Sequence, residues 1–400
     1  MAGIVVIGAG QAGASLVARL RDGGYAGALT LIGEEPVPPY QRPPLSKKYL
    51  LGEMPRERLF LRPLSYYAEA GIALRMGVRV TAIDRAARAV VMGDERLGYS
   101  HLVLATGARP RRLPAAIGGD LAGVHVVRTL ADIDAMAPGI RAGARLLIVG
   151  GGYIGLEAAA VAVSRGMAVT LIEMAPRILG RVAAPETADY FRALHTRHGV
   201  TIREGVGLER LTGDTRVTGA RLTDGTGIAA DMVIAGIGIT PETTLAEAAG
   251  LEVADGIAVD EEGRTSDPAI WAAGDCASFP YRGGRLRLES VPNAIDMAEC
   301  VADNILGRGT AYQPRPWFWS DQYDVKLQIA GLGAGYERVV TRDTPGAFSV
   351  WYYAGDRLLA VDAMNDPRAY MVVKRLIEAG RGADPARVAD PDTDLKALLA

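Results

Sequence analysis

Glycines at two places in the chain have the spacing of a turn that binds a pyrophosphate. The pattern G-x-G-x-x-G occurs at Gly8, Gly10 and Gly13, and again at Gly150, Gly152 and Gly155. The first glycine of such a pattern permits a tight turn, the second lets the backbone approach a phosphate, and the third lets a helix pack closely on a strand. The helix N-terminus adds unpaired N–H groups and partial positive charge. Each pattern therefore predicts a dinucleotide site.

An acidic residue follows each glycine pattern about 20 residues further along the chain. Glu34, with Glu35 as the alternative, follows the first pattern, and Glu173 follows the second. A carboxylate at this position accepts hydrogen bonds from a ribose diol and repels a 2′-phosphate, so Glu173 favours NADH over NADPH. Arg177 nearby weakens that preference a little. Two complete sites indicate an enzyme that binds two dinucleotides.

Two strand–helix–strand units must position these glycines. Short apolar, β-branched runs predict strands that are covered on both faces, and small and apolar residues at helical spacing predict the helices. The first unit is expected at Gly3–Gly10, Gln11–Arg21 and Ala28–Gly33, and the second at Leu146–Gly150, Tyr153–Ser164 and Ala168–Glu173.

The remaining segments suggest how these units are distributed over domains. Further strands are expected at Leu102–Gly107 and Ile270–Asp275, and a capped helix at Ser290–Ile305. Beyond Tyr312 the alternating, aromatic-rich stretches predict an antiparallel sheet. We therefore expect an α/β protein with two Rossmann-like dinucleotide-binding domains and a C-terminal α+β domain. The predicted boundaries are residues 1–111 with 241–312 for the first domain, 112–240 for the second and 313–400 for the third.

Composition excludes several other classes of protein. A formal net charge of −2 and the absence of a basic stripe argue against a nucleic-acid partner. The apolar stretch of residues 144–163 is interrupted by charges and glycines, so we expect no membrane span. The first residues lack the basic start of a signal peptide, and we expect a cytoplasmic protein. The oligomeric state, monomer or weak dimer, stays open.

Cysteine and histidine usage excludes thiol relays and metal centres within the chain. Cys276 and Cys300 are far apart in sequence, and Cys276 is interpreted as a small packed residue. His195 and His198 have a spacing that can share a metal, but they lack a third ligand at an obvious spacing and are interpreted as solvated helix residues. We predict no metal site.

The sequence around the glycines matches the motifs of one family. These motifs are QRPPLSK (41–47), LATGARPR (104–111), GGGYIGLE (150–157), AAGDCA (272–277), ESVPNA (289–294) and WFWSDQYDVKLQIAG (317–331). Over essentially its whole length the chain resembles the FAD-dependent, NADH-using ferredoxin reductases of bacterial P450 and Rieske-type oxygenase systems, which have a glutathione-reductase-like fold.

The resemblance implies which cofactor each site takes and which residues contact it. FAD is expected in the first domain and NADH in the second. The expected cofactor-binding residues beyond those six glycines and two acids are Ala12, Arg42, Lys47, Val80, Thr106, Gly107, Arg128, Ile154, Gly238, Gly274, Asp275 and Val291. Proline at 292 replaces the glutamine that relatives often carry, and it removes a backbone N–H, so the flavin contact there is expected to fall to Val291 or Asn293.

Three residues are implied to act in the reaction itself. Lys47 and Glu157 are expected to form a charged pair near the flavin N5, and Trp319 is expected to lie close to the isoalloxazine and exclude water. Burying one member of a charged pair without the other costs about 3 to 5 kcal/mol, so pairing is expected if both are inside. Two unrelated surface charges, and core packing for Trp317 and Trp319, remain the alternatives.

The missing thiols favour a one-electron acceptor. Related peroxidases and water-forming oxidases carry a cysteine where this chain has PPLSKK, so electrons are expected to leave the flavin directly, to a [2Fe-2S] ferredoxin. The basic residues considered for its docking are Arg42, Lys48, Arg285, Arg287 and Arg315. A reductase of a quinone or monodehydroascorbate-like acceptor is the alternative enzyme, and a signalling flavoprotein that contacts nucleic acid is the alternative outside that class.

Overall fold

The computed structural model describes residues 2–399, and these residues form two units. The first unit combines Met1–Arg42, Pro55–Arg109 and Ile239–Arg315. The second combines Pro43–Met54, Pro110–Gly238 and Pro316–Ala400. Pro43–Met54, which we had expected within the first domain, packs with the second unit. The three-domain division expected from the sequence stays a prediction.

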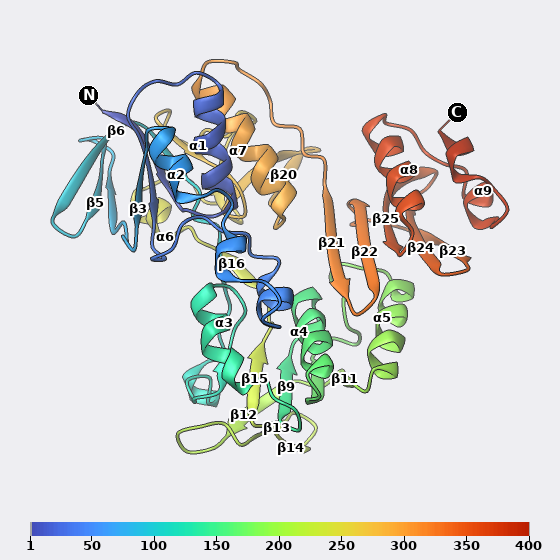
Figure 1. Ribbon diagram of the computed structural model, residues 1–400. Helices are drawn as coiled ribbons and strands as arrows, with labels where there is room; N and C mark the ends of the chain where they lie inside the picture. The colour runs from blue at the N-terminus through green and yellow to red at the C-terminus, as the bar shows by residue number, and fades with distance from the viewer. Residues whose placement is uncertain (1, 400) are drawn as a thin grey trace. The chain divides into compact units, whose positions relative to one another are not determined.

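A parallel sheet extended by an antiparallel meander forms the centre of the first unit (Figure 1). The parallel strands, in spatial order, are β3 (Ile72–Met76), β2 (Leu29–Gly33), β1 (Gly3–Ile7), β6 (Glu95–Leu104) and β18 (Ile270–Ala272). The meander adds β5 (Ala89–Met92) and β4 (Ala82–Asp84) to the start of β6. All five residues of β1 are buried, as the β-branched run predicts for a strand covered on both faces.

Helix α1 (Gln11–Asp22) follows β1 and lies beside α7 (Val291–Ile305) in Figure 1. An ion pair of 2.8 Å between Arg19 and Asp303 joins the two helices. The smaller elements of this unit are α2 (Leu64–Glu69), α6 (Thr244–Ala248), β16 (Ile239–Pro241), and the strands β17 (Ile257–Ala258), β19 (Ala277–Tyr281) and β20 (Gly284–Leu286). The N- and C-terminal parts of this unit therefore share one core, although the second glycine turn separates them in sequence.

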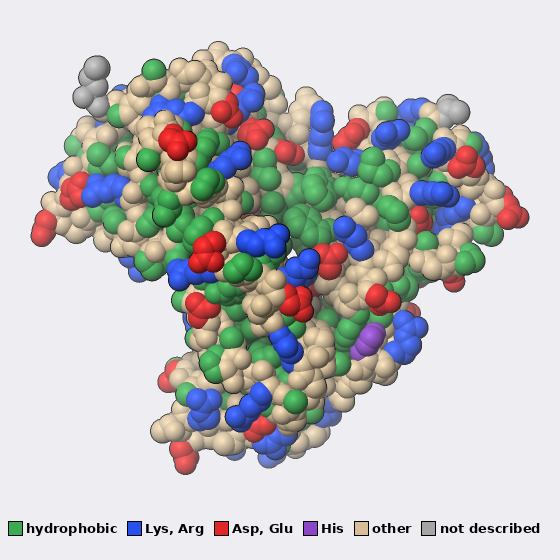
Figure 2. Space-filling model, in the orientation of Figure 1, with side chains coloured by type: hydrophobic (Ala, Val, Ile, Leu, Met, Phe, Trp, Pro, Cys, Tyr) green, Lys and Arg blue, Asp and Glu red, His purple; other side chains and the backbone are tan. Residues whose placement is uncertain are grey.

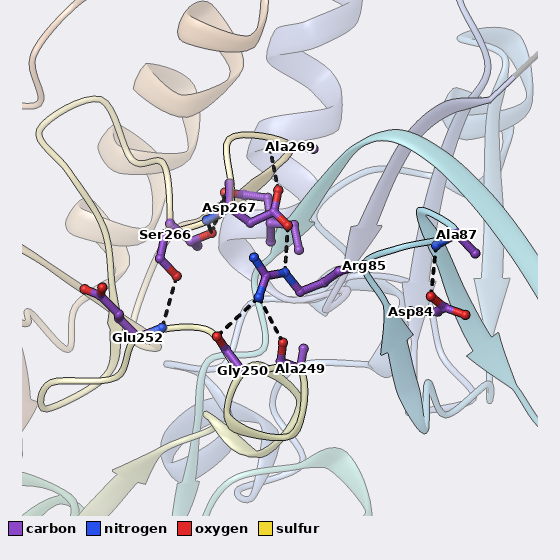
Figure 3. Close-up of polar contacts among 11 residues, drawn as sticks. Asp84, Arg85, Ala87, Ala249, Gly250, Glu252, Ser266, Asp267 and Ala269 are labelled. Carbon is purple, nitrogen blue, oxygen red and sulfur yellow. Dashed lines mark hydrogen bonds and ion pairs between the residues drawn. The ribbon is translucent and has the colours of Figure 1, made fainter.

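Figure 3 shows how one arginine joins three separate segments of the first unit. Arg85, just after β4, donates through Nε to Asp267 at 2.7 Å and through Nη1 to the carbonyl oxygens of Ala249 and Gly250, both at 3.3 Å. A planar guanidinium can make these bonds together because its donors diverge in one plane. The turn between β4 and β5 is thereby tied to the part of the chain that returns after residue 239.

The second unit contains a five-stranded parallel sheet with its own glycine turn. The strands in spatial order are β11 (Thr201–Glu204), β10 (Ala168–Glu173), β9 (Arg145–Val149), β15 (Met232–Ala235) and β8 (Val124–His125). Its helices are α3 (Leu130–Met136), α4 (Tyr153–Ser164) and α5 (Pro185–Arg197), and β12 (Leu208–Thr212), β13 (Gly219–Leu222) and β14 (Gly227–Ala229) form a separate antiparallel sheet. The bounds of α4 and β10 are those predicted from the sequence.

The last part of the second unit is an antiparallel sheet, drawn in orange to red in Figure 1. Its strands are β21 (Trp317–Gln322), β22 (Val325–Gly331), β25 (Arg357–Met364), β24 (Ala347–Ala354) and β23 (Arg338–Thr344), with helices α8 (Pro367–Glu378) and α9 (Pro385–Ala389). Trp351, Tyr353 and residues of α8 form its core. The predicted fold class, two Rossmann-like halves with a C-terminal α+β part, is confirmed.

Candidate functional site: two glycine turns and a buried ion pair

The first glycine turn has the close approaches that the sequence predicted. Gly8 has a φ of +112°, and a methyl group placed on it would lie 2.0 Å from the carbonyl oxygen of Ala105. A methyl group on Gly13 would lie 1.9 Å from the carbonyl oxygen of Gly8, so only glycine lets α1 pack this closely on the turn. Gly10, the N-cap of α1, has no atom within 4 Å of such a methyl group.

The second turn repeats this geometry. Gly150 has a φ of +110°, and a methyl group there would lie 2.4 Å from the carbonyl oxygen of Gly236. A methyl group on Gly155 would lie 2.2 Å from the carbonyl oxygen of Gly150. Gly152, the N-cap of α4, again faces open space.

Both turns fit the pyrophosphate of a dinucleotide. Neither Gly10 nor Gly152 supplies a side-chain cap, and the first turns of α1 and α4 contain no acidic residue. The first N–H groups of each helix therefore point toward space that the middle glycine leaves open. An anion placed there would be stabilised by those N–H groups and by the helix dipole.

The acids at the ends of the second strands are held differently in the two turns. Glu173 accepts from the backbone N–H of Gly151 at 2.7 Å and from that of Ala175 at 2.8 Å, so it also stabilises the glycine turn. A carboxylate has about four acceptor positions, so two remain for a ribose diol. Glu34 is 68% exposed and pairs with Arg79 at 3.3 Å. Glu35, the alternative acid, is engaged by other side chains.

A cluster of charged and polar side chains surrounds Arg42 in the first unit. Arg42 donates to Glu35 at 2.7 Å and to the Tyr40 hydroxyl at 2.9 Å, and that hydroxyl donates to Glu35 at 2.6 Å. Burial opposes the charge of Arg42, but Tyr40, Glu35 and Asp275 together hold its pKa above the ordinary value. Arg42 and Asp275, which the resemblance assigned to the same cofactor, therefore lie close enough to interact.

The other predicted residues of the first unit lie around this glycine turn or pack beneath it. Thr106 donates to the Glu242 carbonyl at 2.7 Å, and the Gly107 carbonyl accepts from Glu242 at 2.9 Å. Gly274 has a φ of +83°, and a methyl group there would lie 3.0 Å from the Ala12 side chain. The close packing of these two segments therefore requires a small residue at both positions. Val80 is buried in the core.

Val291 and Asn293, on either side of Pro292, are the two candidates for the flavin contact, and Val291 is the better placed. Val291 is the first residue of α7, where a backbone N–H has no partner within the helix. The side chain of Asn293 donates to the Leu288 carbonyl at 3.1 Å and accepts from Tyr312 at 2.9 Å. Because Asn293 is engaged in this way, Val291 is the stronger candidate for a flavin contact.

The second turn presents apolar side chains to solvent. Ile154, which the sequence predicted as a cofactor contact, is 44% exposed, and Met174, which it did not, is 79% exposed next to Glu173. Gly238 has a φ of +96° and open space around it, and Arg128 precedes the N-cap of α3. The sequence could have pointed to Met174, because it directly follows the acid predicted to bind a ribose.

Lys47 and Glu157 form an ion pair of 2.7 Å within the second unit, as the resemblance implied. Glu157 lies on α4 with a side-chain exposure of 5%, so the alternative of two unrelated surface charges is wrong. Lys47 lies in a π-helical turn, Leu45–Tyr49, whose backbone departs from helical geometry at Lys47. Such turns frequently occur at functional sites.

Glu157 also accepts two hydrogen bonds that the sequence did not predict. Ser46 donates to it at 3.0 Å and Ser320 at 2.7 Å. Ser46 stands in the PPLSKK segment, where relatives of another class carry a cysteine, and Ser320 stands in WFWSDQYD. The Glu157 charge is thus compensated by one ammonium group and two hydroxyl groups.

His195 is not a solvated residue, and this interpretation was wrong. It is fully buried, and its Nε2 lies 2.7 Å from Oε1 of Gln322. His198 is exposed and stacks on Tyr323 with the ring centres 3.7 Å apart. His195 lies in the last turn of α5 and His198 is its C-cap, and the sequence spacing did not show that only His195 is buried.

Trp319 and Trp317 stack on each other, with ring centres 5.4 Å apart. Both are partly buried, and Trp317 also packs against the core of the C-terminal sheet. A packing role is therefore present for Trp317, and the role of Trp319 beside a flavin stays a prediction.

The two cysteines of the chain are both free thiols. Cys276 is fully buried, and burial raises the pKa of its thiol; burial also raises that of Cys300 to about 11. Neither thiol is poised to act as a thiolate. No group of three or more His, Cys, Asp or Glu side chains in this range is arranged to hold a metal ion, and none of its helices has the length and apolar character needed to cross a membrane.

Comparisons with known proteins place the chain in a family. Residues 2–298 match the family described as pyridine nucleotide-disulphide oxidoreductase, and residues 317–399 match the reductase C-terminal family. The chain is 43% identical to rhodocoxin reductase of Rhodococcus erythropolis, covering 99% of this chain and 94% of that protein. It is 42% identical to putidaredoxin reductase of Pseudomonas putida, covering 99% and 96%.

A solved structure gives the same result in three dimensions. The crystal structure of the covalent putidaredoxin reductase–putidaredoxin complex contains a chain that is 41% identical, with a TM-score of 0.96, covering 100% of this chain and 98% of that one. The predicted resemblance is confirmed over the full length. The chain belongs to the pyridine nucleotide-disulphide oxidoreductases, in the group that carries the reductase C-terminal domain.

Proposed function

We propose that the protein transfers electrons from NADH, through bound FAD, to a [2Fe-2S] ferredoxin that serves a P450 or Rieske-type oxygenase. The observation that carries the proposal is the pair of matching glycine turns, each with an open middle glycine at a helix N-terminus. The names of the relatives support the acceptor, because rhodocoxin reductase and putidaredoxin reductase are named for ferredoxin-type partners. The net reaction converts NADH and two oxidised ferredoxins to NAD⁺, a proton and two reduced ferredoxins.

Each turn would hold one cofactor. The turn at Gly8–Gly13, with Arg42, Asp275 and the N-terminus of α7, would hold FAD, and the turn at Gly150–Gly155 would hold NADH. FAD accepts a hydride and releases electrons singly, which is the chemistry required between a nicotinamide and an iron–sulfur centre. The protein's own groups would bind and orient the two cofactors, and Lys47 with Glu157 would supply a fixed pair of charges in the second unit.

The second turn is suited to NADH rather than NADPH. Glu173 is held in place by two backbone N–H groups, and its negative charge would repel a 2′-phosphate. Arg177, the residue that could have reversed this preference, donates to the Ala183 carbonyl at 2.8 Å. Its guanidinium is thus partly engaged, and we expect a strong preference for NADH.

The structure narrows the proposed ferredoxin dock. Arg287 is only 10% exposed and pairs with Glu289 at 2.7 Å, and Arg285 donates to the carbonyl oxygens of Val259 and Ser278. Lys48 and Arg315 are exposed and stay on the list of candidates. On the face shown in Figure 2, basic and acidic side chains are interspersed, which does not favour a nucleic-acid surface.

Anaerobic titration tests the proposal. The purified protein is expected to be yellow, to bleach fully with NADH, and to regain its colour when an oxidised [2Fe-2S] ferredoxin is added. The absorbance of the iron–sulfur cluster should fall in parallel. Recoloration by a quinone or a monodehydroascorbate-like acceptor but by no ferredoxin would favour the alternative enzyme, and a colourless protein that refuses FAD would refute both.

A further inference from the structure

A continuous chain of hydrogen bonds leads from the Lys47–Glu157 pair to a histidine on α5. Ser320 Oγ lies 2.7 Å from Glu157 Oε1, and Gln322 Nε2 lies 3.1 Å from Ser320 Oγ. Gln322 Oε1 lies 2.7 Å from His195 Nε2. The Tyr323 hydroxyl, 3.2 Å from His195 Nδ1, is the last member. Glu157, Ser320, Gln322 and His195 are all buried.

The charge of Glu157 determines the direction of every bond in this chain. A carboxylate paired with an ammonium group accepts only, so the Ser320 hydroxyl must donate to it. The lone pairs of Ser320 then accept from the Gln322 N–H, which turns Oε1 of that amide toward His195. His195 must therefore carry its proton on Nε2, and its bare Nδ1 accepts from Tyr323. Each donor points toward Glu157.

The surroundings of His195 favour this neutral form. Burial lowers the pKa of His195 to about 4, so the ring is uncharged at neutral pH. A neutral imidazole has one donor and one acceptor, which is the set that Gln322 and Tyr323 require. The His195 imidazole is thus uncharged, and its hydrogen bonds to Gln322 and Tyr323 determine which ring nitrogen carries the single proton.

We propose that His195 is a positioning residue for the Lys47–Glu157 pair: as the neutral Nε2–H tautomer, it donates to Oε1 of Gln322 and holds in place the amide whose N–H donates to Ser320, the hydroxyl that Glu157 accepts from. The assignment of the ion pair to the hydride-transfer step rests on the proposed function. The chain orients Glu157 rather than conducting a proton, because an amide in the middle can pass a proton only by changing its own tautomer.

Nitrogen NMR of the imidazole rings tests the tautomer without using activity. Holoenzyme labelled with ¹⁵N-histidine is expected to show, for His195, a ring that is protonated on Nε2 and bare on Nδ1 between pH 6 and pH 8. His195→Gln should remove that signal and so assign it. Ser320→Ala should shift it, because the Gln322 amide then loses its acceptor. An Nδ1–H tautomer, an imidazolium, or a signal unmoved in Ser320→Ala would each overturn the proposal.

Two substitutions at His195 separate positioning from packing. Glutamine can place an N–H near the position of Nε2, whereas leucine fills the space without a donor. Flavin reduction at saturating NADH is expected to slow roughly tenfold in His195→Leu and to stay within roughly threefold in His195→Gln, from the loss of one hydrogen bond in a chain that ends on a charge. Thr196→Ala, at an exposed position of α5 outside the hydrogen-bonded chain, should leave the rate unchanged.

An isosteric change covers the case in which His195→Leu does not fold. Gln322→Glu keeps an acceptor for His195 but removes the N–H that donates to Ser320, so it should also slow flavin reduction about tenfold. Equal rates in His195→Leu and His195→Gln, or a normal rate in Gln322→Glu, would overturn the proposal. Normal reduction by NADH with no transfer to any ferredoxin would instead contradict the proposed function alone.

Discussion

The middle and last glycines of each turn should respond to alanine in opposite ways, because one faces open space and the other faces backbone. At Gly152, which has a φ of −81° and nothing within 4 Å of an added methyl group, alanine is accommodated by the protein itself. The cost to folding should stay below about 1 kcal/mol, the effect of replacing an N-cap glycine. At Gly155 the methyl group would lie 2.2 Å from the Gly150 carbonyl oxygen, about 1 Å inside ordinary contact. Overpacking of this kind costs about 3 kcal/mol.

Ligand binding should show the reverse order. In Gly152→Ala the methyl group occupies the space proposed for the NADH pyrophosphate, so the KM for NADH should rise at least tenfold, about 1.4 kcal/mol, with flavin content unchanged. In Gly10→Ala, where the added methyl group also meets nothing within 4 Å, flavin content should fall while the apoprotein stays folded.

Thermal unfolding, flavin absorbance and steady-state kinetics measure these effects in four variants, Gly10→Ala, Gly13→Ala, Gly152→Ala and Gly155→Ala. Gly13→Ala and Gly155→Ala should unfold at lower temperature than their partners. Equal stability of Gly152→Ala and Gly155→Ala, or an unchanged KM for NADH in Gly152→Ala, would refute the assignment of the middle glycine to ligand approach.

Three further outcomes follow from the buried charges of the second unit. Lys47→Met leaves the Glu157 charge without its cation and should cost about 3 kcal/mol in chemical denaturation, against less than about 0.5 kcal/mol for exposed Lys48→Met. Burial lowers the pKa of His195 from 6.5 to about 4, so its contribution to stability is lost as pH falls through this range, by roughly 3 kcal/mol; His195→Gln should therefore gain stability relative to wild type as pH falls from 6.5 to 4. Burial raises the pKa of Asp362 from 3.8 to about 6, so its contribution is lost as pH rises and offsets that of His195; Asp362→Asn should gain stability relative to wild type as pH rises from 4 to 6, measured by chemical denaturation.

Local sequence predicted the elements that carry the dinucleotide turns. The helix at Tyr153–Ser164 and the strand at Ala168–Glu173 were predicted to the residue, because each has an apolar pattern bounded by glycine or by a charge. The strand expected at Leu102–Gly107 instead ends at Leu104 and begins at Glu95, since its first half pairs with the meander. The first half of this strand contains polar residues, so a pattern of consecutive apolar residues does not predict it.

Segment Pro43–Met54 lies within the predicted boundaries of the first domain but packs with the second unit, because nothing in its composition says which neighbour it packs against. The same limit applies to the acids: Glu34 and Glu35 are adjacent in sequence, and only the positions of Arg42 and Tyr40 show that Glu35 is engaged. Contacts between segments far apart in the chain determine which neighbour a segment packs against and which side chains are engaged. No local sequence pattern predicts these contacts.

The sequence by itself determined the two glycine turns, because close backbone approach needs glycine at particular spacings and this requirement is local. It also determined that a thiol relay is missing, since that depends on residue type alone. Only the tertiary structure showed that Glu157 is buried among Lys47, Ser46 and Ser320, and that Gln322 and His195 continue the chain of hydrogen bonds. Burial and hydrogen-bond direction depend on which distant segments meet, and the physical chemistry of a charge changes when water is excluded from it.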